Sequence, residues 1–528
     1  MGVTIGGQIE RVNGKELHYK EFAERYLRRN QPVLLTGLME GWRACDDWVA
    51  EDGLFNLDFF STHFGNSRVQ LSLGYVLFPE VVHAGCLTHF LDSIHLGVLF
   101  QHLALSFEGR MLMVADCSRK EFTDQKRIEM SVLEFIAYWH SLSAGNSGNY
   151  SSQDMDPQPL LYLKDWHFIK EFSGYLAYTT SPFFIDDWLN LYLDSYSMHQ
   201  DSSMQQRKNE QDCSDYRFVY MGPKGTWTPL HADVFRSYSW SGNVCGRKHW
   251  YLLPPSQCHL LFDRHQRNSV YDIFDEVSEK KFPGFMQEDT VSINHNWFNG
   301  YNLSFVWNLL LKDYSEAKDY IEDIRDICDN FELLCQRNLA ANTGMNFYDF
   351  FMFIIRFTLA SFALLYHLKE EGNSTFRSSS KVKQLIFNLG AIYNVAKNME
   401  SVEAFTEVNL RALSGEDWYA LTDINRITGE DRFHEFTMAI YKAYELTDEP
   451  QEKGLSLSST SPCPSACLSP SCFGKLCFLQ AHEAKICCPT DLVGLIEHFL
   501  KDPDGIFGAL DAHLFQELDG QISSFFGY

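Results

Sequence analysis

The stretch GTWTPLHAD, residues 225–233, is the most informative part of the sequence. If it forms a β-strand, His231 and Asp233 point to the same face, because side chains two residues apart share one side of a strand. An imidazole and a carboxylate are two of the three ligands of the facial triad that holds non-haem iron(II). The pattern therefore makes His231 and Asp233 candidate metal ligands.

A second stretch, GRKHWYLLPP at residues 246–255, places Lys248, Trp250 and Leu252 on one face of an expected strand. A lysine buried among aromatic side chains needs a counter-anion, because an unpaired buried charge is very costly. A dicarboxylic cosubstrate would supply that anion. The alternative interpretation is an exposed lysine on an edge strand.

Short β-rich segments surround these two stretches. Residues 216–311 contain apolar runs separated by glycine, proline and asparagine turns, which is typical of a sandwich or barrel. After residue 312 the apolar residues recur at helical spacing, which predicts helices for more than a hundred residues. We expect residues 350–366 to form a buried helix, because Arg356 interrupts the run and a bilayer span needs about 20 clean apolar residues.

The sequence resembles the jumonji C family of protein hydroxylases and demethylases in TPLHAD, in SWSGNVCGRKHWYLLPP and, upstream, in YLRRNQPVLLTGLMEGWRACDDWV. The resemblance implies an α+β fold with a double-stranded β-helix core of the cupin or jelly-roll type, N-terminal α/β elements and a helical C-terminal region. It also implies that His231 and Asp233 bind Fe(II), and that Lys248 and Thr228 hold the distal carboxylate of the cosubstrate 2-oxoglutarate. Asn294 and Asn296 would line the same site, and O2 would be the oxidant.

The resemblance also implies an activity and a partner. It points to hydroxylation of a lysine side chain in a protein substrate, the eukaryotic release factor 1 of translation termination, by a cytoplasmic enzyme. Histone lysine demethylation is the first alternative, although no chromatin-reader module or basic nuclear-targeting run is present. A non-catalytic relative that keeps the fold and binds a protein partner is the second alternative.

One expected feature of the family is not visible. The second histidine of the triad usually stands in a Pro-Gly-Trp-x-His segment before the SINHNW strand, but here FPGF runs directly into MQEDTVSINHNW. His295 and His249 are poor substitutes, since strand alternation turns them away from Asn294 and Lys248. His259 and His265 would reach the site only by rearrangement. The third ligand is therefore unidentified, and the junction at residues 285–286 suggests an atypical gene model or splice product.

The chain divides into six predicted regions. They are an N-terminal helix and strand region, an atypical apolar insert, the jumonji C β-barrel domain, a helical region, a disordered linker rich in Ser, Pro and Cys, and C-terminal helices, at residues 1–69, 70–112, 113–312, 313–450, 451–489 and 490–528. The histidines of the insert and the cysteines of the linker have spacings that do not favour a metal site. The helices after residue 312 are open to two interpretations, a substrate platform or a homodimer interface.

The amino-acid composition indicates which classes of binding partner suit the protein. Against 44 Lys and Arg stand 69 Asp and Glu, so the net charge is −25 and a nucleic-acid partner is not expected. A basic protein or peptide suits this surface better. The first twenty residues contain no apolar core of a secretory signal and no membrane span is expected, so the 14 cysteines should be reduced thiols.

Overall fold

The computed structural model describes eleven stretches of the chain. They are residues 6–67, 112–121, 124–145, 159–198, 215–254, 256–257, 271–272, 288–370, 379–413, 416–448 and 486–501. The predicted insert at 70–112 except its last residue, most of the linker, the junction at 285–286 and most of the C-terminal tail lie outside these stretches.

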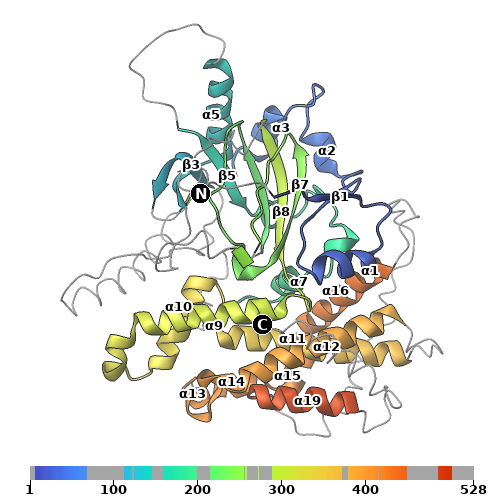
Figure 1. Ribbon diagram of the computed structural model, residues 1–528, viewed down its shortest axis with the longest axis vertical. Helices are drawn as coiled ribbons and strands as arrows, with labels where there is room; N and C mark the ends of the chain where they lie inside the picture. The colour runs from blue at the N-terminus through green and yellow to red at the C-terminus, as the bar shows by residue number, and fades with distance from the viewer. Residues whose placement is uncertain are drawn as a thin grey trace.

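A six-stranded antiparallel sheet is the centre of the upper half of the molecule (Figure 1). Its strand order is β4-β3-β5-β6-β8-β7. The strands are β3 (Leu112–Glu121), β4 (Asp124–Met130), β5 (Leu161–Trp166), β6 (Arg217–Gly222), β7 (Tyr238–Cys245) and β8 (Thr290–Trp297). Consecutive strands are not always neighbours, since β8 is inserted between β6 and β7, as expected for a jelly-roll-like arrangement.

One face of the sheet, which we call the outer face, is densely apolar. Leu163 of β5, Val219 of β6 and Ile293 of β8 all belong to one buried cluster. Trp48 and Phe60 from the N-terminal region join that cluster, and both are fully buried. The N-terminal region therefore covers the outer face and stabilises the sheet by removing apolar area from water.

The elements that cover the outer face come from the N-terminal region and from the segments between β4 and β6. They are β1 (Glu10–Asn13) and its parallel partner β2 (Val33–Thr36), with α1 (Tyr19–Phe22), α2 (Arg43–Asp47), α3 (Leu57–Phe64), α5 (Val132–Gly145) and α6 (Phe168–Glu171). In α3, the Asn56 side chain accepts a hydrogen bond from the Phe59 amide, which caps the first turn. Figure 1 shows α2 and α3 beside the sheet, and α5 above it.

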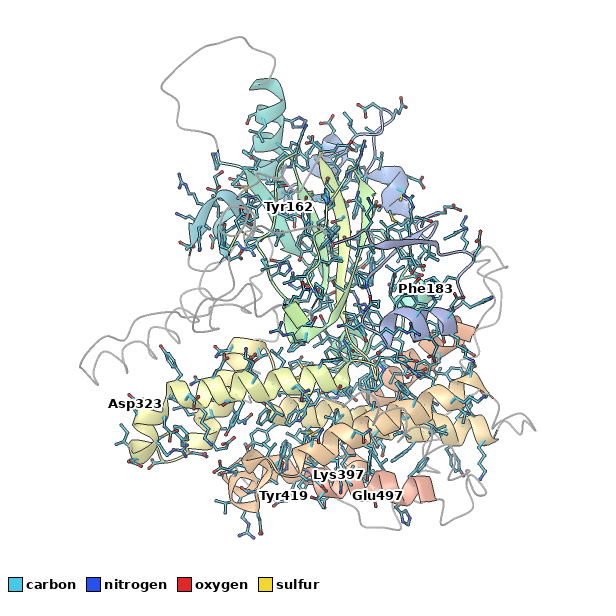
Figure 2. The ribbon with its side chains drawn as sticks, viewed as in Figure 1. Tyr162, Phe183, Asp323, Lys397, Tyr419 and Glu497 are labelled. Atoms are coloured by element: carbon cyan, nitrogen blue, oxygen red, sulfur yellow. The ribbon has the colours of Figure 1, made fainter. Side chains whose placement is uncertain are left out.

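The lower half of the molecule is helical, as the sequence predicts (Figure 1). Its helices are α7 (Trp188–Ser195), which leads into it from the sheet, then α9 (Leu303–Tyr320), α10 (Phe331–Thr343), α11 (Phe347–Glu370), α12 (Ser380–Met399), α13 (Glu407–Ala412), α14 (Glu416–Leu421), α15 (Ile424–Thr428), α16 (Asp431–Asp448) and α19 (Pro489–Lys501). Figure 2 labels Lys397 on α12 and Glu497 on α19; the hydroxyl of Tyr393 donates to Glu497 Oε1 at 2.9 Å and joins these two helices.

The central helix α11 is long and apolar enough to cross a membrane by length and composition alone. In the molecule, 89% of its most apolar window is buried by the rest of the chain. Its Arg356 is 3% exposed, donates to the hydroxyl of Tyr192 and lies over the ring of Tyr196. The prediction of a buried helix is confirmed.

The α+β class with an antiparallel sheet core and a helical C-terminal region is confirmed. Two strand predictions are wrong, because neither residues 228–234 nor residues 246–254 form an extended strand; only Lys248 makes an isolated bridge. A strand needs a neighbour to complete its hydrogen bonds. No strand in the described part of the chain pairs with either segment, so both run as irregular backbone.

Candidate functional site

The inner face of the central sheet, opposite the outer face, is polar. On β8 it carries Ser292, Asn294 and Asn296, whereas His295 and Trp297 point to the outer face. All eight residues of β8 are buried. A polar face inside a sheet that is otherwise apolar indicates a binding surface, because buried polar groups are costly unless they have partners.

His231 and Asp233 converge next to this face. The Nε2 atom of His231 lies 3.8 Å from Oδ1 of Asp233, and their side chains are 53% and 33% exposed. The Nδ1 atom of His231 lies 2.8 Å from the carbonyl oxygen of Pro229. Because a carbonyl only accepts, Nδ1 must carry the proton, which leaves the Nε2 lone pair directed towards Asp233. A divalent metal ion is suited to bind between them.

The backbone after Asp233 is held in an unusual conformation. A turn of 3-10 helix, Val234–Arg236, follows, and φ is 52° at Phe235 and 51° at Arg236. Non-glycine residues in this region carry strain that the surroundings must offset. Phe235 is 1% exposed and packs on Tyr216 and Phe298, so its burial in the helical core holds Asp233 in place.

Lys248 is half-buried and directed towards the inner face. Its Nζ lies 3.5 Å from the Ser292 hydroxyl, 5.0 Å from the ring centre of Tyr220 and 4.7 Å from that of Trp250. Burial, followed by the charge of Lys164, lowers the pKa of Lys248 to about 7. Among the residues that the structure describes, no carboxylate lies within 4.0 Å of this ammonium group.

The groups around Lys248 suit a carboxylate ligand. Tyr162 on β5 is fully buried, and its hydroxyl has no hydrogen-bond partner within the described part of the chain. The rings of Tyr162 and Tyr220 lie 6.1 Å apart, so the free hydroxyl and Lys248 border the same aromatic pair. A cation with no carboxylate within 4.0 Å and a hydroxyl with no hydrogen-bond partner, both judged among the described residues, are the groups that a buried carboxylate requires. Tyr162, labelled in Figure 2, lies within the sheet.

The other predicted site residues are on or near this face. Asn294 is 8% exposed and donates to the Ser292 hydroxyl at 3.1 Å, while Asn296 donates to Ser237 at 3.4 Å. Thr228 is half-buried in the irregular segment before His231. The structure brings together Lys248, Ser292 and Asn294, and it shows no hydrogen bond from Thr228 among the described residues.

The third metal ligand is not found. Within the described stretches, no group of three or more His, Cys, Asp or Glu side chains could hold a metal ion. His295 faces the outer face, as predicted, where it bonds to the Tyr178 hydroxyl and packs on Trp240. His249 is exposed and stacks on Tyr251, while His259 and His265 lie outside the described residues.

The sequence interpretation missed Tyr162 and Lys164. Both belong to LYLKDW, where alternate residues share a face, so the spacing could have placed these two side chains together on one side of the strand. The apolar partners Leu161 and Leu163 face the other side. The signal was present, but it is visible only once β5 is known to be a central strand.

Comparison with known proteins identifies the family. The family model described as a cupin-like domain matches residues 19–296. The arginine-specific demethylase JMJ20 of Arabidopsis thaliana is 44% identical over 527 aligned positions, covering 94% of this chain and 98% of that protein.

Two further relatives are named as 2-oxoglutarate and iron-dependent oxygenase JMJD4. The protein of Danio rerio is 32% identical over 372 positions, with 64% of this chain and 72% of the relative covered. The protein of Homo sapiens is 32% identical over 345 positions, with 60% and 76% covered. The resemblance predicted from the sequence is confirmed: the chain belongs to the cupin-like jumonji C family, together with these oxygenases and the arginine-specific demethylase.

Proposed function

We propose that this protein is an oxygenase that uses Fe(II), 2-oxoglutarate and O2 to oxidise a side chain of a protein substrate. The class and its cofactors follow from the relatives named as 2-oxoglutarate and iron-dependent oxygenases. The observation that carries the proposal is the half-buried ammonium group of Lys248, which has no carboxylate within 4.0 Å in the described stretches and lies on the polar face that meets His231 and Asp233.

Each residue has a role that its contacts support. His231 and Asp233 would hold the metal, with the Pro229 carbonyl fixing the imidazole so that Nε2 faces the ion. Lys248 would bind the distal carboxylate of 2-oxoglutarate, with the Tyr162 hydroxyl as a second donor. Fe(II) and O2 supply the oxidising chemistry. The described residues thus supply groups that suit the cosubstrate. They also supply two of the three protein ligands that a facial triad uses.

The substrate is proposed to be a basic side chain of a protein. The net charge of −25 favours a basic partner, and both candidate reactions attack a C–H bond of a cationic residue. Lysine hydroxylation of release factor 1, which would place the enzyme in the cytoplasm, is the candidate that the family resemblance implies. Demethylation of methylarginine is the second, because the relative that is 44% identical is named as an arginine-specific demethylase.

One assay separates these candidates. Purified protein is incubated with Fe(II), ascorbate, 2-oxoglutarate and either release factor 1 or methylarginine and methyl-lysine peptides, and the products are read by mass spectrometry. Gain of one oxygen atom on a lysine supports hydroxylation, and loss of a methyl group with release of formaldehyde supports demethylation. The His231→Ala variant is the control. Turnover that survives in this variant, or no turnover and no metal in the wild type, would leave the non-catalytic binding protein as the better description.

A further inference from the structure

Lys164 is a second cation on the inner face, and no role is yet assigned to it. It lies on β5 and is 5% exposed. The pairing of Leu163 with Met221 and of Trp166 with Val219 places Lys164 beside Tyr220, the residue whose ring also contacts Lys248. Burying a lysine costs the desolvation free energy of its ammonium group, which an apolar residue at the same position would avoid. A buried lysine therefore indicates a specific role.

Among the described residues, Lys164 has a carboxylate within 4.0 Å, whereas Lys248 has none. The Lys164 Nζ lies 3.7 Å from Asp124. Arg127 lies 3.1 Å from both Asp124 and Asp165, so two cations face two carboxylates. Lys164 therefore does not require an anionic ligand. Its ammonium group has further N–H donors, and their partners indicate its role.

One of those hydrogens goes to Gln125 on β4. Lys164 Nζ lies 3.1 Å from Gln125 Oε1, and Gln125 is 1% exposed. An ammonium group can only donate, so it fixes the amide with its oxygen towards Lys164. The amide nitrogen Nε2 is then directed to the carbonyl oxygen of Trp227, to which it donates at 2.9 Å.

Trp227 begins the segment that carries the candidate metal ligands. It stands one residue before Thr228 and four before His231. Its indole Nε1 donates back to the carbonyl of Cys117 on β3 at 3.2 Å, and the Cys117 thiol donates to the Trp227 carbonyl at 3.4 Å. With the bond from Gln125, three hydrogen bonds tie the segment to the sheet. Residues 226–233 form no strand and so have no backbone hydrogen bonds to a neighbouring strand. Side-chain contacts such as these must hold the segment in their place.

We propose that Lys164 and Gln125 are a positioning pair that fastens residues 226–233 to the central sheet and thereby sets where His231 and Asp233 stand relative to Lys248. Neither residue is a candidate ligand of the metal or of the cosubstrate. The link to metal binding rests on the proposed function, whereas the fastening of the segment does not.

The test uses Gln125→Glu, which removes the donor to Trp227 but keeps an acceptor for Lys164. Hydrogen exchange of the backbone amides in residues 226–233 is measured on the full-length, metal-free protein. Faster exchange is expected in Gln125→Glu and in Lys164→Met, and near wild-type exchange in Lys164→Arg, which retains a cationic donor. Unchanged exchange in Gln125→Glu would overturn the proposal.

A matched control is Gln336→Glu. Gln336 is an equally buried glutamine on α10, bonded to Glu332 and to the Phe347 amide in the helical core. It should leave exchange in residues 226–233 unchanged. Equal acceleration in Gln125→Glu and Gln336→Glu would show that general loss of stability opens the segment, and this result would also contradict the pair.

Mn(II) affinity is the second measurement. Outer-shell partners of metal ligands typically change affinity by about 10- to 100-fold, so Gln125→Glu and Lys164→Met should weaken Mn(II) binding at least tenfold, with recovery in Lys164→Arg. Wild-type affinity in Gln125→Glu would contradict the positioning role. A wild-type protein that binds no Mn(II) would count against the proposed function, while the exchange data would still decide whether the pair fastens the segment.

Discussion

The two faces of the central sheet are made from the same strands and have opposite properties. On β8, Ile293 and Trp297 join a continuous apolar cluster with the N-terminal region, and even His295 on that side is paired with a buried tyrosine. On the inner face, Ser292 and Asn294 bond mainly to each other, and Lys248 stands above them without a carboxylate partner among the described residues. The outer face is covered by apolar side chains of the chain itself, whereas the inner face holds a cation that suits an anionic ligand.

This difference separates stability from function within single strands. Apolar burial on the outer face contributes about 25 cal/mol for each Å² removed from water. The inner face holds a lysine whose burial is unfavourable without an anion. Substitutions on the outer face should therefore lower the free energy of unfolding, whereas substitutions on the inner face should lower ligand affinity.

The largest effect is expected for Trp166→Ala on the outer face. Trp166 is fully buried, and its ring packs on Phe60, Phe64 and Phe168. Removing a buried tryptophan leaves a cavity and should lower the free energy of unfolding by about 3–5 kcal/mol. Urea denaturation followed by circular dichroism measures it. A loss below about 1 kcal/mol would mean that the outer face is not the stabilising side.

The second effect is on ligand affinity. Lys248→Met should weaken 2-oxoglutarate binding by at least about 30-fold, corresponding to the loss of about 2 kcal/mol from one partner of a charge pair. The free energy of unfolding should not fall, because the variant removes a partly buried cation that no described carboxylate contacts within 4.0 Å. Calorimetric titration in the presence of Mn(II) gives the affinity.

The adjacent cation supplies a matched control for that variant. Arg247 is exposed and pairs with Glu288 at 2.8 Å on the surface. Arg247→Met should leave 2-oxoglutarate affinity within about twofold, since an exposed ion pair is worth little. Equal losses in Arg247→Met and Lys248→Met would show that the affinity depends on general surface charge and not on the inner face.

The third effect is a pH dependence. Burial, followed by Lys164, sets the pKa of Lys248 near 7 in the free protein, and a dicarboxylate binds the charged form. Affinity should therefore be nearly constant below pH 7 and should fall by up to about tenfold per pH unit above it. Calorimetry from pH 6 to pH 9 measures this slope. The slope should disappear in Lys248→Met, and an identical slope in that variant would assign the titration to another group.

The smallest effect is expected for His231→Ala on stability. The His231 side chain is 53% exposed, and its hydrogen bond is to a backbone carbonyl nearby in the chain. The free energy of unfolding should change by no more than about 0.5 kcal/mol, as for other exposed positions, while Mn(II) binding is lost. Thermal unfolding with and without Mn(II) reports both. A large loss of stability would place His231 among the structural residues.

Alternation along β8 predicted that Asn294 and Asn296 share a face and that His295 lies opposite, and the structure agrees. Asn294 and Asn296 face inward and His295 faces outward, because β8 is paired on both sides and its register is fixed. The same reasoning failed for TPLHADV and for KHWYLLPP. A strand depends on its neighbour as well as on its own residues, and no strand among the described residues pairs with these segments.

Other features could not be predicted from local pattern. The left-handed conformation at Phe235 is sustained by contacts with Tyr216 and Phe298, residues that are near it only in the folded protein. The bond from Gln125 to Trp227 likewise joins positions 102 residues apart. The candidate metal ligands and the candidate cosubstrate-binding lysine were recognisable in the sequence. The contacts that position them depend on the assembled sheet.

The most direct test of the central claim is a crystal structure of the protein with Mn(II) and 2-oxoglutarate. The account predicts the metal between His231 Nε2 and the Asp233 carboxylate, with the distal carboxylate of 2-oxoglutarate on Lys248 Nζ. The crystal structure would also reveal which atom takes the third ligand position on the metal. A ligand bound away from the inner face, or Lys248 turned into solvent in the complex, would contradict it.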